Sequence, residues 1–157
     1  MEVERIMNRN AKVCHPDETL NQAARIMWEN RCGGVPVVDE QFRPVGFLTD
    51  RDVCMAAYTQ GKSLDALRVE GAMARKLVCC KAQDDLVDAA TLMRQTGVRR
   101  LPVTDREGKL VGILSLDDLA HEATRKLKGA VNEPLRNLVA EVCISINRGH
   151  VRVNPPV

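Results

Sequence analysis

The stretch of sequence that decides the fold occurs twice. Residues 33–52 read GGVPVVDEQFRPVGFLTDRD, and residues 99–118 read RRLPVTDREGKLVGILSLDD. Aligning residues 7–58 with residues 73–124, without a gap, gives 15 identities in 52 positions. Composition alone would give roughly three or four. We therefore predict two copies of one supersecondary unit.

A helix precedes the repeated stretch in each copy. In the first copy it follows a capping sequence at residues 16–19. Its apolar side chains then recur at the i, i+3, i+4, i+7 spacing of an amphipathic helix: Leu20, Ala23, Ala24 and Met27. The second copy repeats this stripe from Leu86 to Met93. A further stripe from Leu135 to Val142 predicts a tail helix at about residues 133–143, which must pack against another element.

Two strands and a second helix follow in each copy. The predicted strands are apolar runs that flank a polar turn: 35–38 with 45–48, and 101–104 with 110–114. Thr49 and Ser115, each followed by acidic residues, can cap the second helix. An earlier strand, near Cys14 in one copy and Cys80 in the other, is only weakly marked. The pattern predicts an α+β fold.

The repeat divides the chain into four parts. We predict a first domain over residues 6–60, a linker over 61–72, a second domain over 73–127 and a C-terminal extension over 128–157.

Composition narrows the possible classes of function. The chain has 157 residues, 45% of them hydrophobic and 28% charged, which is typical of a folded domain. No apolar run approaches the roughly 20 residues that cross a bilayer. The amino terminus has no secretory signal pattern, so we expect a cytoplasmic protein with no membrane partner. The net charge of +2 is too small to argue for a nucleic-acid surface.

The cysteines, methionines and histidines do not indicate a metal or redox site. The six cysteines include no C-x-x-C pair, and we expect them to be reduced core residues. The three histidines are scattered singly, so no metal site is predicted. Four methionines recur at repeat positions and are expected in the core: Met7, Met27, Met73 and Met93.

Residues 6–124 resemble tandem cystathionine β-synthase (CBS) domains, the pair called a Bateman module. The residues that carry the resemblance are GGVPVVD (33–39) with VGFLTDRD (45–52), and VRRLPVTD (98–105) with VGILSLDD (111–118). The resemblance implies a β-α-β-β-α unit in each copy, a pseudo-twofold axis between the copies, and a homodimer. It also implies regulation or energy sensing through an adenosine ligand bound in clefts between the copies. AMP, ADP or ATP is the first expectation, with S-adenosylmethionine or NAD as alternatives, and no cofactor is required.

By the same resemblance, Asp52 and Asp118 are the candidate ribose ligands. A carboxylate in the first turn of a helix can accept from the 2′ and 3′ hydroxyls of a ribose, with each charge-assisted hydrogen bond contributing on the order of 1.5 to 3 kcal/mol. Thr49 and Ser115, together with helix N-terminal amides, could meet a phosphate. The alternative is that both aspartates only stabilise the start of their helix.

The two copies differ on the phosphate side. Arg99 and Arg100 can form bidentate phosphate contacts, whereas Gly33 and Gly34 at the same positions cannot. We therefore expect the better site to be the one served by Asp118 and Arg100, although the arginines could also be a solvated surface pair. Further charge could come from Lys12 and Arg51, and the base would lie near the weakly marked strands at residues 13–14 and 79–80.

No motif for catalysis is present, so we do not expect an enzyme. Two alternatives to ligand sensing remain open. One is a constitutive scaffold or oligomerisation module. The other, less favoured, is nucleic-acid binding through the basic tail, which has Arg125, Lys126, Lys128, Arg136, Arg148 and Arg152. The regulated partner protein is not specified by the sequence.

Overall fold

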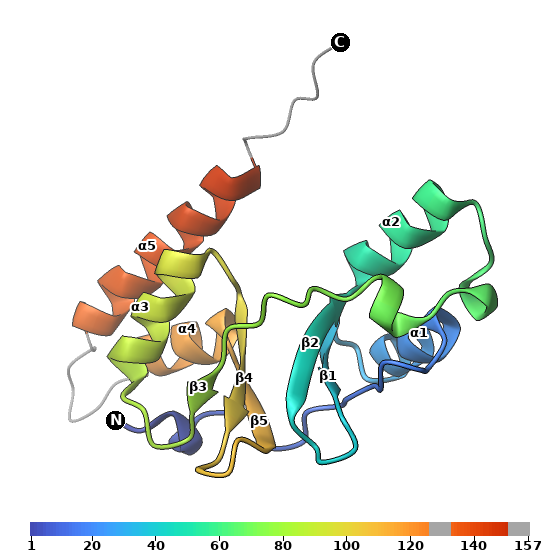
Figure 1. The fold of residues 1–157 in the computed structure, drawn as a ribbon. Coiled ribbons are helices and arrows are strands. Elements are labelled where there is room, and N and C mark those ends of the chain that lie inside the picture. Colours follow the sequence, from blue (N-terminus) through green and yellow to red (C-terminus); the bar gives the residue numbers. More distant parts are fainter. Residues whose placement is uncertain (126–132, 151–157) are drawn as a thin grey trace. The chain divides into compact units, whose positions relative to one another are not determined.

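The computed structural model of the chain describes residues 1–125 and 133–150, with side chains up to Ile146. The chain forms two compact units (Figure 1). The first-repeat unit comprises Asn10–Leu77 and Thr104–Val111. The second-repeat unit comprises Met1–Arg9, Val78–Val103 and the chain from Gly112 onward.

The first-repeat unit contains two helices and a two-stranded antiparallel sheet. Its elements in chain order are α1 (Leu20–Glu29), β1 (Gly34–Val38), β2 (Pro44–Thr49) and α2 (Asp50–Gln60), followed by the 3-10 turns η2 (Leu64–Ala66) and η3 (Val69–Gly71). Thr19 caps α1 through a reciprocal capping box with Gln22. The apolar stripe predicted for this helix faces the core, where Leu20 and Ala23 are fully buried.

The second repeat has the same helix–strand–strand–helix order and three further elements: a 3-10 turn and a short strand before it, and a helix after it. It contains η1 (Val3–Arg5), β3 (Cys80–Lys81), α3 (Leu86–Thr96), β4 (Arg100–Thr104), β5 (Leu110–Ser115), α4 (Leu116–Thr124) and α5 (Glu133–His150). The three strands form one sheet in the order β3-β4-β5. The four recurring methionines are buried, as predicted.

Two predicted elements differ from the structure. Near Cys14 there is only an isolated bridge to Val37, so the first copy has no strand matching β3. The tail helix continues to His150 and does not end near residue 143. The predicted linker 61–72 contains all of η2 and η3.

The segment before each copy packs on the other copy's helix. In the second-repeat unit, the Val3 N–H donates to Asp84 O (2.9 Å), and the Leu86 N–H donates to Met1 O (2.8 Å). In the first-repeat unit, equivalent bonds join Val69 N to Glu18 O (2.9 Å) and Leu20 N to Leu67 O (2.9 Å). Residues 1–6 and 67–72 are thus a further repeated segment, which lies outside the aligned residues 7–58 and 73–124.

Two matched glycines allow these segments to cross the sheets. Backbone hydrogen bonds join Asn8 to Ile113 beside Gly112, and Ala74 to Phe47 beside Gly46. A Cβ on Gly112 would lie 2.9 Å from Asn8 O, and one on Gly46 would lie 2.5 Å from Met73 Sδ. The repeated V-G pair in the second strand therefore marks a close approach of two backbones.

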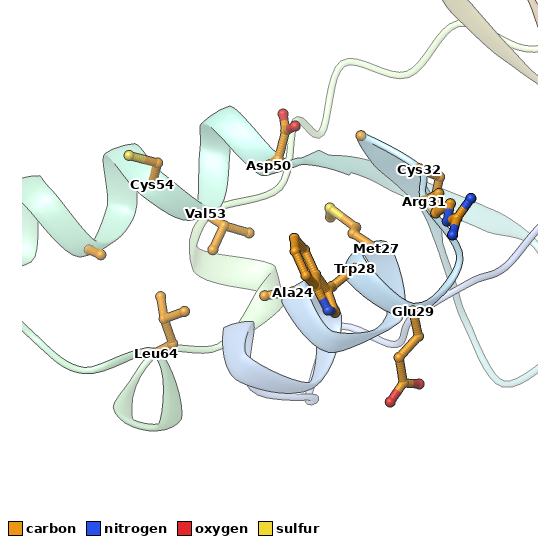
Figure 2. Close-up of a pocket in the computed structure, with 12 residues that line it drawn as sticks. Ala24, Met27, Trp28, Glu29, Arg31, Cys32, Asp50, Val53, Cys54 and Leu64 are labelled. Atoms are coloured by element: carbon orange, nitrogen blue, oxygen red, sulfur yellow. The ribbon is translucent and has the colours of Figure 1, made fainter.

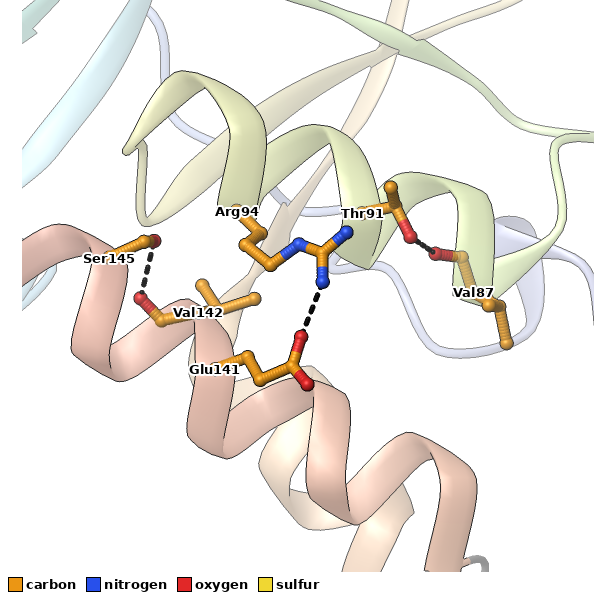
Figure 3. Close-up of polar contacts among 6 residues, drawn as sticks. All are labelled: Val87, Thr91, Arg94, Glu141, Val142 and Ser145. Carbon is orange, nitrogen blue, oxygen red and sulfur yellow. Dashed lines mark hydrogen bonds and ion pairs between the residues drawn. The ribbon is translucent and has the colours of Figure 1, made fainter.

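Helix α5 covers the second repeat. It packs against both α3 and α4, and its Leu135, Val142 and Ile146 are buried. Arg94 of α3 pairs with Glu141 of α5 at the exposed edge of this contact (Figure 3). The predicted packing of the tail helix is confirmed.

Candidate functional site

The paired aspartates and their capping partners form the same structure in both repeats. Ser115 is the N-cap of α4: its N–H and hydroxyl both donate to Asp118 Oδ2 (2.8 and 2.6 Å), and its Oγ accepts from Asp118 N (3.1 Å). Thr49 and Asp52 repeat these bonds at the start of α2, at 2.9, 2.7 and 3.2 Å. Each pair is a capping box, which fixes the orientation of the carboxylate.

This geometry leaves one carboxylate oxygen available. The capping bonds all reach Oδ2, and no bond to Oδ1 of either aspartate occurs within the described residues. Asp52 and Asp118 are both half-exposed. An oxygen with two lone pairs, held at a fixed orientation beside solvent, can accept from the hydroxyls of a ribose.

The helix N-terminus offers less to a phosphate than the sequence suggested. The Ser115 hydroxyl proton is directed to Asp118, and the Leu116 N–H donates to Arg99 O (2.9 Å). The Asp118 N–H is also used, because it donates to Ser115 Oγ. A phosphate at this place therefore depends mainly on side-chain cations.

Arg99, Arg100 and Ser115 line a small cavity, which we call the arginine hollow. Arg99, which is exposed, and Arg100, which is half-buried, border a cavity of about 240 Å³. Its other lining residues are Ser115, Leu116, Asp117, Cys143 and Ile146. The predicted phosphate ligands and the capping serine are thus brought together within one unit.

The glycines of the first repeat are explained by their neighbours. A Cβ on Gly33 would lie 3.2 Å from Asp50 Oδ2, and one on Gly34 would lie 2.8 Å from the Phe47 ring. The second repeat has Leu116 and Ile113 at the positions of Asp50 and Phe47, and there it carries two arginines. The first repeat therefore lacks the two cations of the second and has the Asp50 carboxylate beside Gly33.

Asp118 also borders a second hollow, which the sequence did not indicate. This cavity of about 390 Å³ is lined by Ile6, Asp118, His121, Glu122, Thr124 and Arg125. Glu122 is 6% exposed, and its Oε1 has no hydrogen-bond partner in the described structure, while Oε2 lies 3.6 Å from Arg125. The first repeat has Ala56 at the position that matches Glu122. This replacement of an alanine by a charged residue is the sequence signal that could have pointed to the second hollow.

Lys12 and Arg51 are not among the lining residues of the arginine hollow. Both are exposed and lie in the first-repeat unit. Of the residues proposed for the base, Cys14 and Cys80 are buried. Burial, with a smaller effect of Glu18, raises the pKa of Cys14 to about 12. Burial, with smaller effects of Asp84 and Cys79, raises the pKa of Cys80 to about 12. Both thiols are therefore neutral core groups.

The prediction that the cysteines lie in the core holds for only some of them. Cys54 on α2 and Cys143 on α5 are exposed, and each lines a cavity. Within the described chain no cysteine is in a disulfide. The same residues contain no cluster of three His, Cys, Asp or Glu side chains that could hold a metal ion.

A cavity lies between α1 and α2 of the first-repeat unit. We call it the α1/α2 groove. It has a volume of about 1110 Å³ and is lined by Ala24, Met27, Trp28, Glu29, Arg31, Cys32, Gly33, Asp50, Val53, Cys54, Ala57 and Leu64 (Figure 2). None of the predicted ligand residues lines this cavity. Of the two glycines that match Arg99 and Arg100 in the first repeat, only Gly33 does.

Comparison with known proteins identifies the family. The protein-family model for the CBS domain matches residues 3–58 and again residues 69–125. The chain belongs to the CBS domain family and contains two copies of the domain. Among the described residues, no helix has the length and apolar character needed to span a membrane.

Relatives and solved structures support the same assignment. The CBS domain-containing protein YhcV of Bacillus subtilis is 37% identical over 118 residues, covering 75% of this chain and 82% of YhcV. Uncharacterized protein MK0525 of Methanopyrus kandleri is 32% identical over 117 residues, covering 74% of this chain and 60% of that protein.

Two solved structures show how far the fold is shared. The CBS domain protein TA0289 of Thermoplasma acidophilum, whose function is described as unknown, superposes with a TM-score of 0.76 at 28% identity, over 94% of this chain and 76% of TA0289. CBSX2 in complex with AMP has a TM-score of 0.66 at 27% identity, over 76% of this chain and 93% of CBSX2.

Proposed function

We propose that this chain is a regulatory module that binds an adenine nucleotide of the AMP, ADP or ATP class through its second repeat. The observation that carries the proposal is the fixed Asp118 carboxylate, with Oδ1 available, hydrogen-bonded to the same serine that borders the arginine hollow. The AMP complex of CBSX2 supports the choice of ligand class. The module signals by a change in conformation or assembly, without catalysis of its own.

The proposed contacts divide the ligand between residues. Asp118 Oδ1 accepts from the ribose hydroxyls, and Arg99 and Arg100 bind the phosphate as charge-assisted donors. Few aromatic side chains are available, since the chain has one Trp, one Tyr and two Phe. The free energy of binding therefore rests mainly on ribose and phosphate.

Isothermal titration with adenosine and with AMP tests this division. Asp118→Asn keeps an acceptor for the capping bonds to Ser115 but replaces the available oxygen by an NH₂ donor. We expect this variant to lower the affinity for both ligands at least tenfold, which corresponds to about 1.4 kcal/mol of binding free energy. Arg100→Ala should weaken AMP by a similar factor and leave adenosine unchanged.

The first repeat supplies the matched control. Asp52→Asn makes the same chemical change in the repeat that lacks the arginines, and we expect AMP affinity to stay within twofold of wild type. An unchanged AMP affinity in Asp118→Asn would reject the assigned site. If neither AMP, ADP, ATP, S-adenosylmethionine nor NAD binds the wild-type chain, the proposed function fails and a constitutive scaffold becomes the better description.

The resemblance to Bateman modules adds three parts to the proposal: a homodimer, a cytoplasmic location and a regulated partner protein. Sedimentation equilibrium with and without AMP tests the first. A mass that stays at one chain under both conditions would exclude signalling by assembly, and a conformational signal would remain. Nucleic-acid binding, the less favoured alternative, would show instead as an affinity that falls steeply with salt.

A further inference from the structure

Helix α5 forms one wall of the arginine hollow. Cys143 and Ile146 of this helix line the hollow together with Arg99, Arg100 and Ser115. The two stretches that match the CBS domain end at residues 58 and 125, so α5 lies outside both of them. A wall that is not part of the repeat therefore limits what the proposed phosphate site can hold.

The packing of α5 anchors this wall on both sides of Cys143. Val142, directly before it, is fully buried, and Ile146, three residues after it, is 4% exposed. Glu141 pairs with Arg94 of α3 (Figure 3). Moving Cys143 away from the hollow would require Val142 and Ile146 to leave their buried positions, which costs free energy. The position of the Cys143 side chain is therefore fixed by its neighbours.

The hollow is small for a nucleotide. Its volume is about 240 Å³, whereas pockets that enclose a whole small molecule have roughly 300–1,000 Å³. Ser115 lines the hollow, but Asp118, the proposed ribose ligand to which Ser115 is hydrogen-bonded, does not. The hollow thus has room for the phosphate end of a nucleotide whose ribose lies outside it. A longer phosphate chain would need the space that α5 occupies.

The charges at the hollow also match a single phosphate. The guanidiniums of Arg99 and Arg100 line it, and so does the exposed carboxylate of Asp117. A phosphate monoester carries about −1.5 to −2 charges at pH 7, which two cations can balance. Each further phosphate group of ADP or ATP adds negative charge near Asp117, and no third cation occurs among the described lining residues.

We propose that α5 makes the second repeat selective for a nucleoside monophosphate over the di- and triphosphate, with Cys143 as the specificity-determining residue. The phosphate lies between the two arginines and the Cys143 thiol, and the bound nucleotide covers that thiol. Asp117 adds to the selectivity by repelling further phosphate groups. This selectivity rests on the nucleotide site proposed above for Asp118, Arg99 and Arg100.

The Cys143 thiol reports on the hollow in the wild-type protein. Cys54 is the internal control, because it is also exposed and does not line the hollow. With AMP at about 100 times its dissociation constant, only about 1% of the sites are free. We expect alkylation of Cys143 by N-ethylmaleimide to slow at least tenfold, and that of Cys54 to stay within twofold. Adenosine, which lacks the phosphate, should leave both rates within twofold. Peptide mass spectrometry over a time course measures both rates in one sample.

Isothermal titration measures the selectivity itself. We expect AMP to bind the wild-type chain at least tenfold more tightly than ATP, with ADP between them. Cys143→Leu fills part of the hollow, and it should lower the affinity for AMP at least tenfold while leaving adenosine within twofold. Cys54→Leu makes the same change on α2 and should leave the affinity for AMP within twofold. Asp117→Asn removes the lining carboxylate and should narrow the difference between AMP and ATP.

Two results would overturn the selectivity and leave the nucleotide site standing. One is ATP that binds the wild-type chain as tightly as AMP does. The other is an alkylation rate of Cys143 that stays unchanged when calorimetry shows that AMP is bound. If no adenosine compound binds, the nucleotide site itself fails, and the selectivity fails with it. The alkylation experiment needs no substitution, so a poorly folded Cys143→Leu variant would not obscure the outcome.

Discussion

At the scale of single residues, the capping role of Asp52 and Asp118 leaves one carboxylate oxygen for the proposed ligand role. Each carboxylate uses Oδ2 for its helix and leaves Oδ1 beside solvent. The two interpretations that the sequence allowed, helix stabilisation and ribose binding, are therefore compatible. Any substitution at these positions has to separate them, which is why asparagine is more informative than alanine.

The capping role alone predicts a loss of stability in the first repeat. Asp52→Ala removes both capping bonds to Thr49, and we expect it to lower the free energy of unfolding by about 1 kcal/mol. Asp52→Asn should recover most of that loss, since its side-chain oxygen still accepts. Urea denaturation of both variants in the absence of nucleotide measures the difference, and equal losses would contradict the capping role.

The cysteines provide a prediction for reactivity and pH. Cys54 and Cys143 are exposed, whereas Cys14 and Cys80 are buried with pKa values raised from 9.0 to about 12. At pH 8 we expect rapid alkylation of the exposed pair and none of the buried pair in the native protein. Peptide mass spectrometry after brief N-ethylmaleimide treatment identifies the labelled residues; early label on Cys14 or Cys80 would contradict their burial.

The same shifts fix the sign of a pH effect. Folding raises these two pKa values, so the folded protein binds the thiol protons more tightly than the unfolded chain does. Their contribution to stability is complete below about pH 9 and is lost as the pH rises toward 12. The midpoint of urea denaturation should therefore decrease between pH 9 and pH 11, and less so in Cys14→Ala.

Residue identity predicted part of the site. The repeat located both aspartates, their capping residues and the arginine pair, because identical or contrasting residues at a fixed offset are visible in the sequence. Glu122 and Ile6 were missed. Their place beside Asp118 depends on a helix turn and on a segment from the distant amino terminus, and neither relation is a local pattern.

At the scale of elements, the glycine of the second strand makes a sharp prediction. Gly112→Ala would place a Cβ 2.9 Å from the backbone oxygen of Asn8, which cannot move without breaking the bonds to Ile113. We expect a loss of about 1–3 kcal/mol, measured as a lower Tm. Gly71→Ala, which meets no atom within 4 Å, is the control and should change Tm little.

Among the described residues, the contact between α3 and α5 includes the Arg94–Glu141 pair and buried apolar side chains. The Arg94 and Glu141 side chains are 41% and 52% exposed, so a double-mutant cycle between them should give less than about 1 kcal/mol. Val142→Ala, at a fully buried position, should cost about 1–3 kcal/mol. A coupling energy that exceeded the cost of Val142→Ala would contradict this ranking.

Elements with strong periodicity were predicted well. Both helices of each repeat and the four longer strands lie where their apolar patterns placed them. The first strand of each copy was only weakly marked in the sequence. It pairs over one or two residues, which is too short to show an alternation of apolar and polar side chains. The tail helix was predicted too short: Ile146 continues its buried apolar stripe beyond residue 143, and the helix ends at His150.

At the scale of the whole molecule, the repeats are alike in fold and unlike in surface. The arginine hollow occurs in the second repeat, whereas the first repeat has Gly33 and Gly34 in place of the arginines and the Asp50 carboxylate beside Gly33. We therefore expect one AMP per chain in calorimetric titration. A stoichiometry of two that falls to one in Asp52→Asn would show that the first repeat also binds nucleotide.

The exchange of the segments at residues 1–6 and 67–72 has a consequence for dissecting the protein. Each unit is discontinuous in the chain, so cutting between the two sequence repeats yields fragments that each lack a segment held by the other. A fragment beginning at residue 73 would leave the donors and acceptors at Asp84 and Leu86 without the partners that Met1 and Val3 provide. We therefore expect that neither repeat folds fully when it is expressed alone. A fusion or tag at the amino terminus is attached to the second-repeat unit.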